Sequence, residues 1–286
     1  MTWTSILMRI ALVAGDGYPR GDLLIEPDAL AKERFGVRIV DARPLEKYKA
    51  AHIAGAVWVD HESWAKAFAD GQNPKDWAER IGKLGIDSPK TRVVIYDDNL
   101  SKDAARIWWI LRYWGVKDVR LLNGGWPGWI AAKRFVSKAS GKVAATTYAI
   151  PEPADNRLAT KDFVLGRLKD KRYQIVDTRS EEEHCGDKKL AKRGGAIPSA
   201  MHLEWSQALD KQTQRFKSPS ELAKLLKDAG IDVEKHTVTY CQSGGRAAVM
   251  AFTLELMGAA EVRNYYRSWA EWGNAEGTPI VTPKRK

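Results

Sequence analysis

A cysteine, two glycines and an arginine lie close together between Thr237 and Ala247. The Val, Thr and Tyr residues that open this segment favour a β-strand, and the Leu, Met and Phe residues beyond it favour a helix. A loop between a strand end and a helix start has free backbone N–H groups. Such groups bind anions, and they lower the pKa of a thiol from about 8.5 toward neutrality. We therefore predict that Cys241 is a nucleophile in a preformed anion pocket rather than a buried structural cysteine.

The residues that follow this cysteine have expected roles in such a pocket. Gly244 and Gly245 supply the backbone angles that fold the loop into a cradle. Arg246 keeps its charge and is expected either to pair with an anionic substrate or to brace the loop. Ser243 is expected either to donate a hydroxyl hydrogen bond or to serve only as a small loop residue. The predicted anion-binding loop consists of Gln242, Ser243, Gly244, Gly245 and Arg246.

The elements that would position this loop occur twice along the chain. A strand ending at Asp177 and Arg179 repeats an earlier strand that ends at Asp41 and Arg43. Strands alternate with helices in both series, which indicates right-handed crossovers and parallel sheets covered on both faces. The predicted fold class is therefore α/β, with two tandem domains that each contain a small parallel sheet.

The two predicted domains differ in their chemistry. The N-terminal domain is expected over residues 18–136, a linker over 137–156 and the C-terminal catalytic domain over 157–283. The linker is rich in small residues, contains proline and lacks periodicity. In the first domain the position of the cysteine is held by Asp97, and a carboxylate there is no nucleophile toward sulfur and repels anions. The first domain is therefore predicted to be catalytically silent, and no metal site is expected.

Other residues are expected near the catalytic loop because the carboxyl ends of parallel strands gather at one edge of a sheet. Asp177 and Arg179 end such a strand, and they either shape the loop and bind substrate or form a structural ion pair. Glu183 lies in a run of three glutamates, a pattern typical of a solvated helix face. Trp269 and Arg193 are candidates for lining the cleft, although Trp269 also suits packing.

Composition narrows the classes of function. The chain has 286 residues and a net charge of +10, which favours an anionic substrate. No basic stripe or nucleic-acid-binding module is present, so no nucleic acid partner is expected. Cys185 and Cys241 form no disulfide framework or metal motif, and Cys185 is either a structural cysteine or a resolving thiol. No membrane span is expected, and the chain is expected to be a monomer or a weak oligomer. A cytoplasmic location is expected, with export as the alternative if residues 1–17 are the remnant of a signal.

Three motifs resemble the rhodanese family of sulfurtransferases. The six-residue loop from Cys241 to Arg246 resembles the loop that carries sulfur as a persulfide in that family. Residues 48–56 resemble its N-terminal signature, and residues 264–272 resemble its C-terminal signature. Tyr266 and Arg267 replace an acidic residue and a glycine that are usual there. The resemblance extends over nearly the whole chain after residue 17, and its tandem arrangement is similar to that of two-domain thiosulfate and 3-mercaptopyruvate sulfurtransferases.

The resemblance implies an activity and a mechanism. It implies sulfur transfer from thiosulfate to cyanide or a thiol, through a persulfide on Cys241, with ping-pong kinetics and no cofactor. It also implies that Asp177 and Arg179 help to shape the loop. The alternatives are 3-mercaptopyruvate as the donor, a cysteine-dependent phosphatase or arsenate reductase on the same fold, or a non-enzymatic sulfur-carrier or interaction module. Related phosphatases use a seven-residue loop, so the six-residue loop favours sulfur over phosphate.

Overall fold

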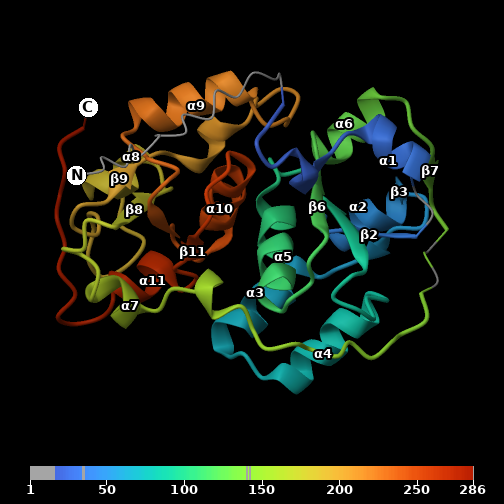
Figure 1. Cartoon of the computed structure of the whole chain (residues 1–286), viewed down its shortest axis with the longest axis horizontal. Helices are drawn as coiled ribbons and strands as arrows, with labels where there is room; N and C mark the ends of the chain where they lie inside the picture. The colour runs from blue at the N-terminus through green and yellow to red at the C-terminus, as the bar shows by residue number, and fades with distance from the viewer. Residues whose placement is uncertain (1–16, 34–35, 140, 142, 286) are drawn as a thin grey trace, which may run out of the picture.

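The computed structural model describes residues 17–33, 36–139, 141 and 143–285 of the chain. The export-signal alternative rests on residues 1–17, and all of these except Gly17 lie outside the described residues. The chain forms two α/β halves side by side (Figure 1), as the strand and helix pattern predicts. No helix in the described ranges is long and apolar enough to cross a membrane.

The first half is built on a five-stranded parallel sheet with the strand order β1-β6-β5-β2-β4. Its strands β2 and β5 are rich in Val and Ile, which suits a sheet buried on both faces. A separate antiparallel pair, β3 with β7, reaches Ser137, the first residue of the predicted linker. The strands are β1 (Leu24–Ile25), β2 (Val37–Asp41), β3 (His52–Ile53), β4 (Val57–Trp58), β5 (Arg92–Tyr96), β6 (Val119–Leu122) and β7 (Val136–Ser137). The helices are α1 (Pro27–Glu33), α2 (Leu45–Ala50), α3 (His61–Asp70), α4 (Pro74–Lys83), α5 (Lys102–Tyr113) and α6 (Gly125–Ala131).

The second half repeats this plan with a four-stranded parallel sheet in the order β11-β10-β8-β9. Helix α9 begins with a capping box on Ser218 and a proline in its first turn, as its sequence predicts. The strands are β8 (Tyr173–Asp177), β9 (Met201–His202), β10 (His236–Tyr240) and β11 (Val262–Asn264). The helices are α7 (Lys161–Leu165), α8 (Glu181–Cys185), α9 (Pro219–Asp228), α10 (Gly245–Leu256) and α11 (Ser268–Trp272).

Helix α10 starts earlier than its apolar pattern predicts. The sequence indicates a helix from Ala247, whereas the structure begins it at Gly245. The difference arises because Gly244 takes a left-handed backbone conformation and acts as the N-cap, so that the chain turns directly from the loop into the helix. Arg246 is therefore the second residue of α10 and lies in its first turn, where the backbone N–H groups have no partner within the helix.

The two halves pack together through α5 and α10, which lie side by side at the centre of the molecule (Figure 1). Trp108 on α5 meets Phe252 on α10 edge to face, with ring centroids 5.0 Å apart. The segment that connects the two halves contacts the first half. The N–H of Thr146 donates to the carbonyl of Gly82, and the hydroxyl of Tyr148 donates to the carbonyl of Trp114. Because one hydrophobic cluster contains residues of both halves, their relative position is fixed by packing.

Candidate active site

Cys241 directly follows β10, where the carboxyl end of the central strand meets the start of α10. Its side chain is buried, and its sulfur accepts a hydrogen bond from the N–H of Gly244 at 3.1 Å. The backbone N–H of Cys241 donates to the hydroxyl of Ser268 at 3.0 Å, and that hydroxyl donates to the carbonyl of Tyr265. The thiol is therefore held inside the loop and faces at least one of its N–H groups.

The carbonyl groups of the first two loop residues are bound at the start of α11. The N–H of Trp269 donates to the carbonyl of Cys241 at 3.0 Å. The N–H of Ala270 donates to the carbonyl of Gln242, also at 3.0 Å. Free N–H groups occur at any helix start, and here they bind the outer side of the loop.

The next two carbonyl groups are bound by side chains. Arg106 Nη1 donates to the carbonyl of Ser243 at 2.8 Å, and Asn264 Nδ2 donates to that of Gly244 at 2.9 Å. In a planar trans peptide the C=O and the following N–H point in opposite directions. With these carbonyls bound from outside, the N–H groups of residues 242–245 point away from those partners, and that of Gly244 reaches the sulfur of Cys241.

Gly244 is the position where this turn requires glycine. Its φ of +82° lies in the left-handed region, where a Cβ is disfavoured. A Cβ there would also lie 2.8 Å from atoms of Tyr266, which has no room to withdraw because it is buried against Phe68 and Trp109. The tyrosine that replaces the usual acidic residue of the C-terminal signature thus packs across the interface between the halves.

Arg246 joins the thiol to a carboxylate on a neighbouring helix. Its Nη1 and Nη2 donate to the two carboxylate oxygens of Glu183 at 2.6 and 2.8 Å. Burial lowers the pKa of Arg246, but Glu183 and the thiolate of Cys241 more than offset this effect, so that the pKa of Arg246 is raised. The guanidinium therefore stays charged beside the sulfur.

Glu183 is not on a solvated helix face, contrary to the expectation from its run of glutamates. Only 3% of it is exposed, and it closes the capping box of α8 by accepting the N–H of Ser180. Burial raises the pKa of Glu183, but Arg246 more than compensates and the pKa is lowered. The Ser-x-x-Glu spacing in the sequence was the available signal for the cap, whereas the partner Arg246 lies far away in sequence.

We expect that Glu183→Gln increases the reactivity of the thiol at low pH. The variant removes a negative charge beside Arg246 and leaves the arginine to interact with Cys241 alone. Alkylation of Cys241 by iodoacetamide at pH 6 is expected to become severalfold faster, since a tenfold change corresponds to about 1.4 kcal/mol. Glu182→Gln is the matched control, because Glu182 is the exposed neighbour on the same helix. Equal rates for the two variants would contradict this role of Glu183.

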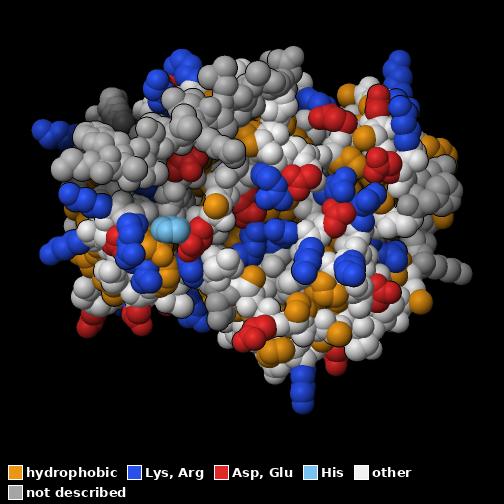
Figure 2. All heavy atoms as spheres, in the orientation of Figure 1, with side chains coloured by type: hydrophobic (Ala, Val, Ile, Leu, Met, Phe, Trp, Pro, Cys, Tyr) orange, Lys and Arg blue, Asp and Glu red, His pale blue; other side chains and the backbone are white. Residues whose placement is uncertain are grey.

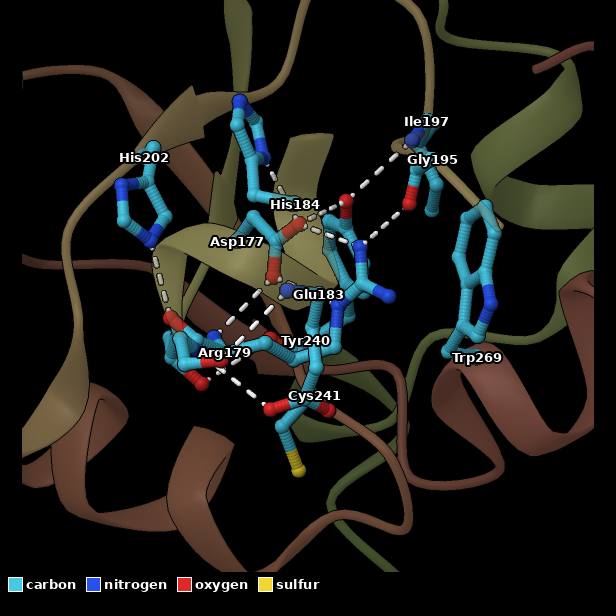
Figure 3. A network of polar contacts seen from close by, with 12 residues as sticks. Asp177, Arg179, Glu183, His184, Gly195, Ile197, His202, Tyr240, Cys241 and Trp269 are labelled. Atoms are coloured by element: carbon cyan, nitrogen blue, oxygen red, sulfur yellow. Dashed lines mark hydrogen bonds and ion pairs between the residues drawn. The ribbon is translucent and has the colours of Figure 1, made fainter. Parts of the chain in front are cut away.

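Asp177 is the centre of a buried polar network behind the loop (Figure 3). Its carboxylate accepts hydrogen bonds from Arg179 Nη2 at 2.6 Å and from the Tyr240 hydroxyl at 2.7 Å, and lies 2.9 Å from His184 Nδ1. Burial raises the pKa of Asp177, but Arg179, His184 and Tyr240 together outweigh it and hold the pKa well below its usual range. Figure 3 shows the sulfur of Cys241 pointing away from this network.

Arg179 is committed to this network. It is 1% exposed, donates to the carbonyl of Gly195 at 2.7 Å and lies 4.3 Å from the ring centroid of Trp269. Its Nε and Nη2 are engaged by Asp177 and the carbonyl of Gly195, so the structure contains the ion pair that was one of its two predicted roles. The first half repeats the arrangement with Asp41, which pairs with Arg43 and accepts from the Tyr96 hydroxyl.

The loop of the first half that is predicted to be silent binds the carboxylate of its own first residue. Asp97 takes the position that Cys241 has in the second half, and it is 1% exposed. It accepts backbone hydrogen bonds at 2.8–3.0 Å from four residues, namely Asn99, Ser101, Asp103 and Ala104. These four N–H groups are engaged by the carboxylate and are not offered to a substrate, which adds a physical reason to the predicted silence of this half.

The two candidates for cleft lining, Trp269 and Arg193, contact each other. Trp269 is buried and its indole N–H donates to the carbonyl of Arg193. Arg193 donates to the carbonyls of Trp272 and Thr278, so it braces the loop that precedes the C-terminal segment. Neither residue lines the cavity of about 510 Å³ beside the catalytic loop. Cys185 is free and half-buried, as Cys241 is free and buried.

That cavity lies between the two halves. Ser243 belongs to its wall, together with Tyr266, Arg267, Lys66 and Arg106. Three of the lining side chains are cationic, and two others, Asp70 and Glu271, are anionic. Across the face in Figure 2, Lys and Arg are likewise interspersed with Asp and Glu. No group of three or more His, Cys, Asp and Glu side chains that would suit a metal ion occurs in the ranges that the structure describes.

Comparison with known proteins gives consistent matches. A family model described as the rhodanese-like domain matches residues 26–132 and again residues 160–275. A thiosulfate sulfurtransferase of Azotobacter vinelandii is 33% identical over 93% of this chain and 99% of its own length. The sulfur carrier protein TtuD of Thermus thermophilus is 32% identical over 93% of this chain and 98% of its own length.

The fold also has solved relatives. The structure of SseA from Escherichia coli, described with the rhodanese fold and the mechanism of 3-mercaptopyruvate sulfotransferases, superposes with a TM-score of 0.77. It covers 87% of this chain and 99% of SseA at 24% identity, so this likeness concerns the fold. The first family match contains every strand of the first parallel sheet except β1, and the second contains the whole second sheet and the cysteine loop.

Proposed function

This chain belongs to the rhodanese family, and we propose that it transfers sulfur from thiosulfate to a thiophilic acceptor through a persulfide on Cys241. One observation carries the proposal. The sulfur of Cys241 accepts the N–H of Gly244 inside a loop whose carbonyls are bound from outside. Such a loop stabilises a sulfur anion before the reaction and after it.

The first half-reaction loads the enzyme. The thiolate of Cys241 attacks the outer sulfur of thiosulfate and forms a new S–S bond. The bond between the two sulfurs of thiosulfate breaks, and sulfite leaves with its electron pair. The enzyme is left as a persulfide, whose terminal sulfur is the transferable atom. The neighbouring charge of Arg246 stabilises the anion in both states.

The second half-reaction returns the enzyme to its starting state. Cyanide or a thiolate attacks the terminal sulfur and takes it as thiocyanate or as a new persulfide, while the Cys241 thiolate leaves. Because the sulfur is carried on the cysteine itself, the cycle needs no cofactor. Both cysteines are unpaired, which suits a reducing compartment such as the cytoplasm.

Intact mass spectrometry tests the proposal directly. The protein is incubated with thiosulfate, desalted, weighed and then treated with cyanide. We expect the mass to increase by one sulfur atom and to return to its initial value as thiocyanate appears. A protein that gains no mass from thiosulfate contradicts the proposed donor.

The same measurement distinguishes the alternatives. Mass gained from 3-mercaptopyruvate but not from thiosulfate assigns the other donor, which contradicts our choice while keeping the mechanism. Hydrolysis of an aryl phosphate without any sulfur uptake contradicts sulfur transfer altogether. Mass gained from thiosulfate that neither cyanide nor a thiol removes contradicts the catalytic cycle.

A further inference from the structure

Arg106 belongs to the silent half, yet its side chain ends on the catalytic loop. It lies on α5, and its Nη1 donates both to the carbonyl of Ser243 at 2.8 Å and to the hydroxyl of Tyr266 at 3.0 Å. A Cβ placed on Gly245 would lie 2.3 Å from Nη2 of Arg106. The guanidinium therefore fits closely against the backbone of the other half.

The carbonyl that Arg106 binds is part of one peptide with the N–H that faces the thiol. Ser243 supplies the C=O and Gly244 supplies the N–H, and these two groups point in opposite directions across a planar unit. On one side the distance from Arg106 Nη1 to the oxygen is 2.8 Å, and on the other the distance from the nitrogen to the Cys241 sulfur is 3.1 Å. A cation on the oxygen polarises the peptide and strengthens the N–H as a donor, since hydrogen bonds in a chain reinforce one another.

Among the described groups that donate to the loop carbonyls, Arg106 is the one that comes from the first half and the one that carries a charge. Burial lowers the pKa of Arg106, but Tyr266 and the thiolate of Cys241 more than offset it and raise that pKa. The charge of Arg106 is thus maintained next to the sulfur.

We propose that Arg106 is a positioning residue supplied by the silent half: it orients and polarises the Ser243–Gly244 peptide so that its N–H stabilises the sulfur anion of Cys241. The reactive loop is then complete only when both halves are docked. This assigns a catalytic contribution to a half that has no nucleophile. The inference deepens the proposed function and rests on it for the sulfur-transfer step, but the reactivity of the thiol can be measured independently.

The test compares Arg106→Met with Arg106→Lys and with a matched control, Arg112→Met. Arg112 lies on the same helix, and its contact with the carbonyl of Lys117 stays within the first half. All variants are made in a Cys185→Ala background, so that Cys241 is the only thiol. The rate of alkylation by iodoacetamide is measured from pH 5 to pH 10, and thermal unfolding confirms that each variant is folded.

We expect the midpoint of the alkylation profile to move up by about one pH unit in Arg106→Met, which corresponds to a tenfold loss of thiolate stabilisation. Persulfide formation from thiosulfate is expected to slow about tenfold or more, as when one oriented donor is removed. Arg106→Lys should recover part of both effects because it restores the charge, and Arg112→Met should change neither.

A folded Arg106→Met protein with the profile of the control would overturn the inference. If Arg106→Met does not fold, Tyr266→Phe decides: it removes one anchor of Arg106, keeps the ring, and is expected to shift the midpoint in the same direction by a smaller amount. An unchanged midpoint in folded Tyr266→Phe would then overturn the inference. A wild type that takes no sulfur from thiosulfate contradicts the proposed function, while the alkylation profile still decides the role of Arg106.

Discussion

Cys241→Ser is expected to reduce thiocyanate formation from thiosulfate and cyanide by more than about a thousandfold, to the uncatalysed background. The hydroxyl of serine is a far weaker nucleophile than a thiolate and forms no persulfide. The substitution is close to isosteric, and the serine oxygen can accept the N–H of Gly244 in place of sulfur. We therefore expect little change in the melting temperature, which separates loss of chemistry from loss of structure.

Cys185→Ser is the matched control, because Cys185 is the other thiol of the chain and lies at the end of α8. Burial, and then the nearby Glu181, raise the pKa of Cys185, which makes it a poor nucleophile at neutral pH. Its replacement should leave sulfur uptake intact. If Cys241→Ser gains one sulfur atom by intact mass, or if Cys185→Ser gains none, the assignment of the persulfide to Cys241 is wrong.

Asp177→Asn is expected to have the largest effect on stability. The change leaves the buried guanidinium of Arg179 without its carboxylate, although Tyr240 and His184 can still contact the amide oxygen. Removing one partner of a buried ion pair typically costs about 3–5 kcal/mol. In a chain of this size such a loss should lower the melting temperature by about 10 °C, measured by calorimetry or circular dichroism.

The control for this prediction is Asp170→Asn. Asp170 pairs with Arg172 at the same spacing of two residues and in the same bidentate geometry, but Arg172 is exposed. Water replaces the lost contact there, so little change is expected. A similar melting temperature for the two variants would show that the network around Asp177 does not stabilise the fold.

The low pKa of Asp177 also gives this effect a pH dependence. Its folded-state pKa lies below the ordinary value of about 3.9, so its contribution is complete above that pH and declines as the pH falls through the folded-state pKa. The difference in stability between wild type and Asp177→Asn should therefore shrink in acid. A difference that grows below about pH 4 would contradict this assignment of the charge.

The sequence was sufficient for the parts of the molecule that depend on local pattern. The apolar run within Arg92–Tyr96 is typical of a central strand, and β5 occupies these residues. Cys241 to Gly244 lie between strand and helix, because the change from β-favouring to helix-favouring residues is visible along the chain, although the helix begins two residues before Ala247. The repeat of Asp41 in Asp177 also predicted that both would end a central strand.

The sequence was insufficient where a contact joins distant segments. Arg106 is 137 positions away from Ser243, and nothing in the helical pattern of α5 distinguishes it from Arg112. Glu183 was predicted to be exposed because runs of charged residues usually are. It is buried instead, and its carboxylate forms an ion pair with Arg246. These contacts depend on how the two halves dock and how α8 meets α10, which local periodicity does not encode.

The occupied loop of the first half has a consequence for how the two halves have diverged. That loop is one residue longer than the catalytic one, since five residues separate β5 from α5 and four separate β10 from α10. Leu100 and Ser101 both take left-handed conformations to bring their part of the loop around the carboxylate of Asp97. A thiol introduced by Asp97→Cys would enter a cradle shaped for two oxygens and would find no counterpart of Arg246. The two halves thus differ in loop length and in backbone conformation, as well as in having Asp97 where the second half has Cys241. We expect that Asp97→Cys alone does not make the first half catalytic.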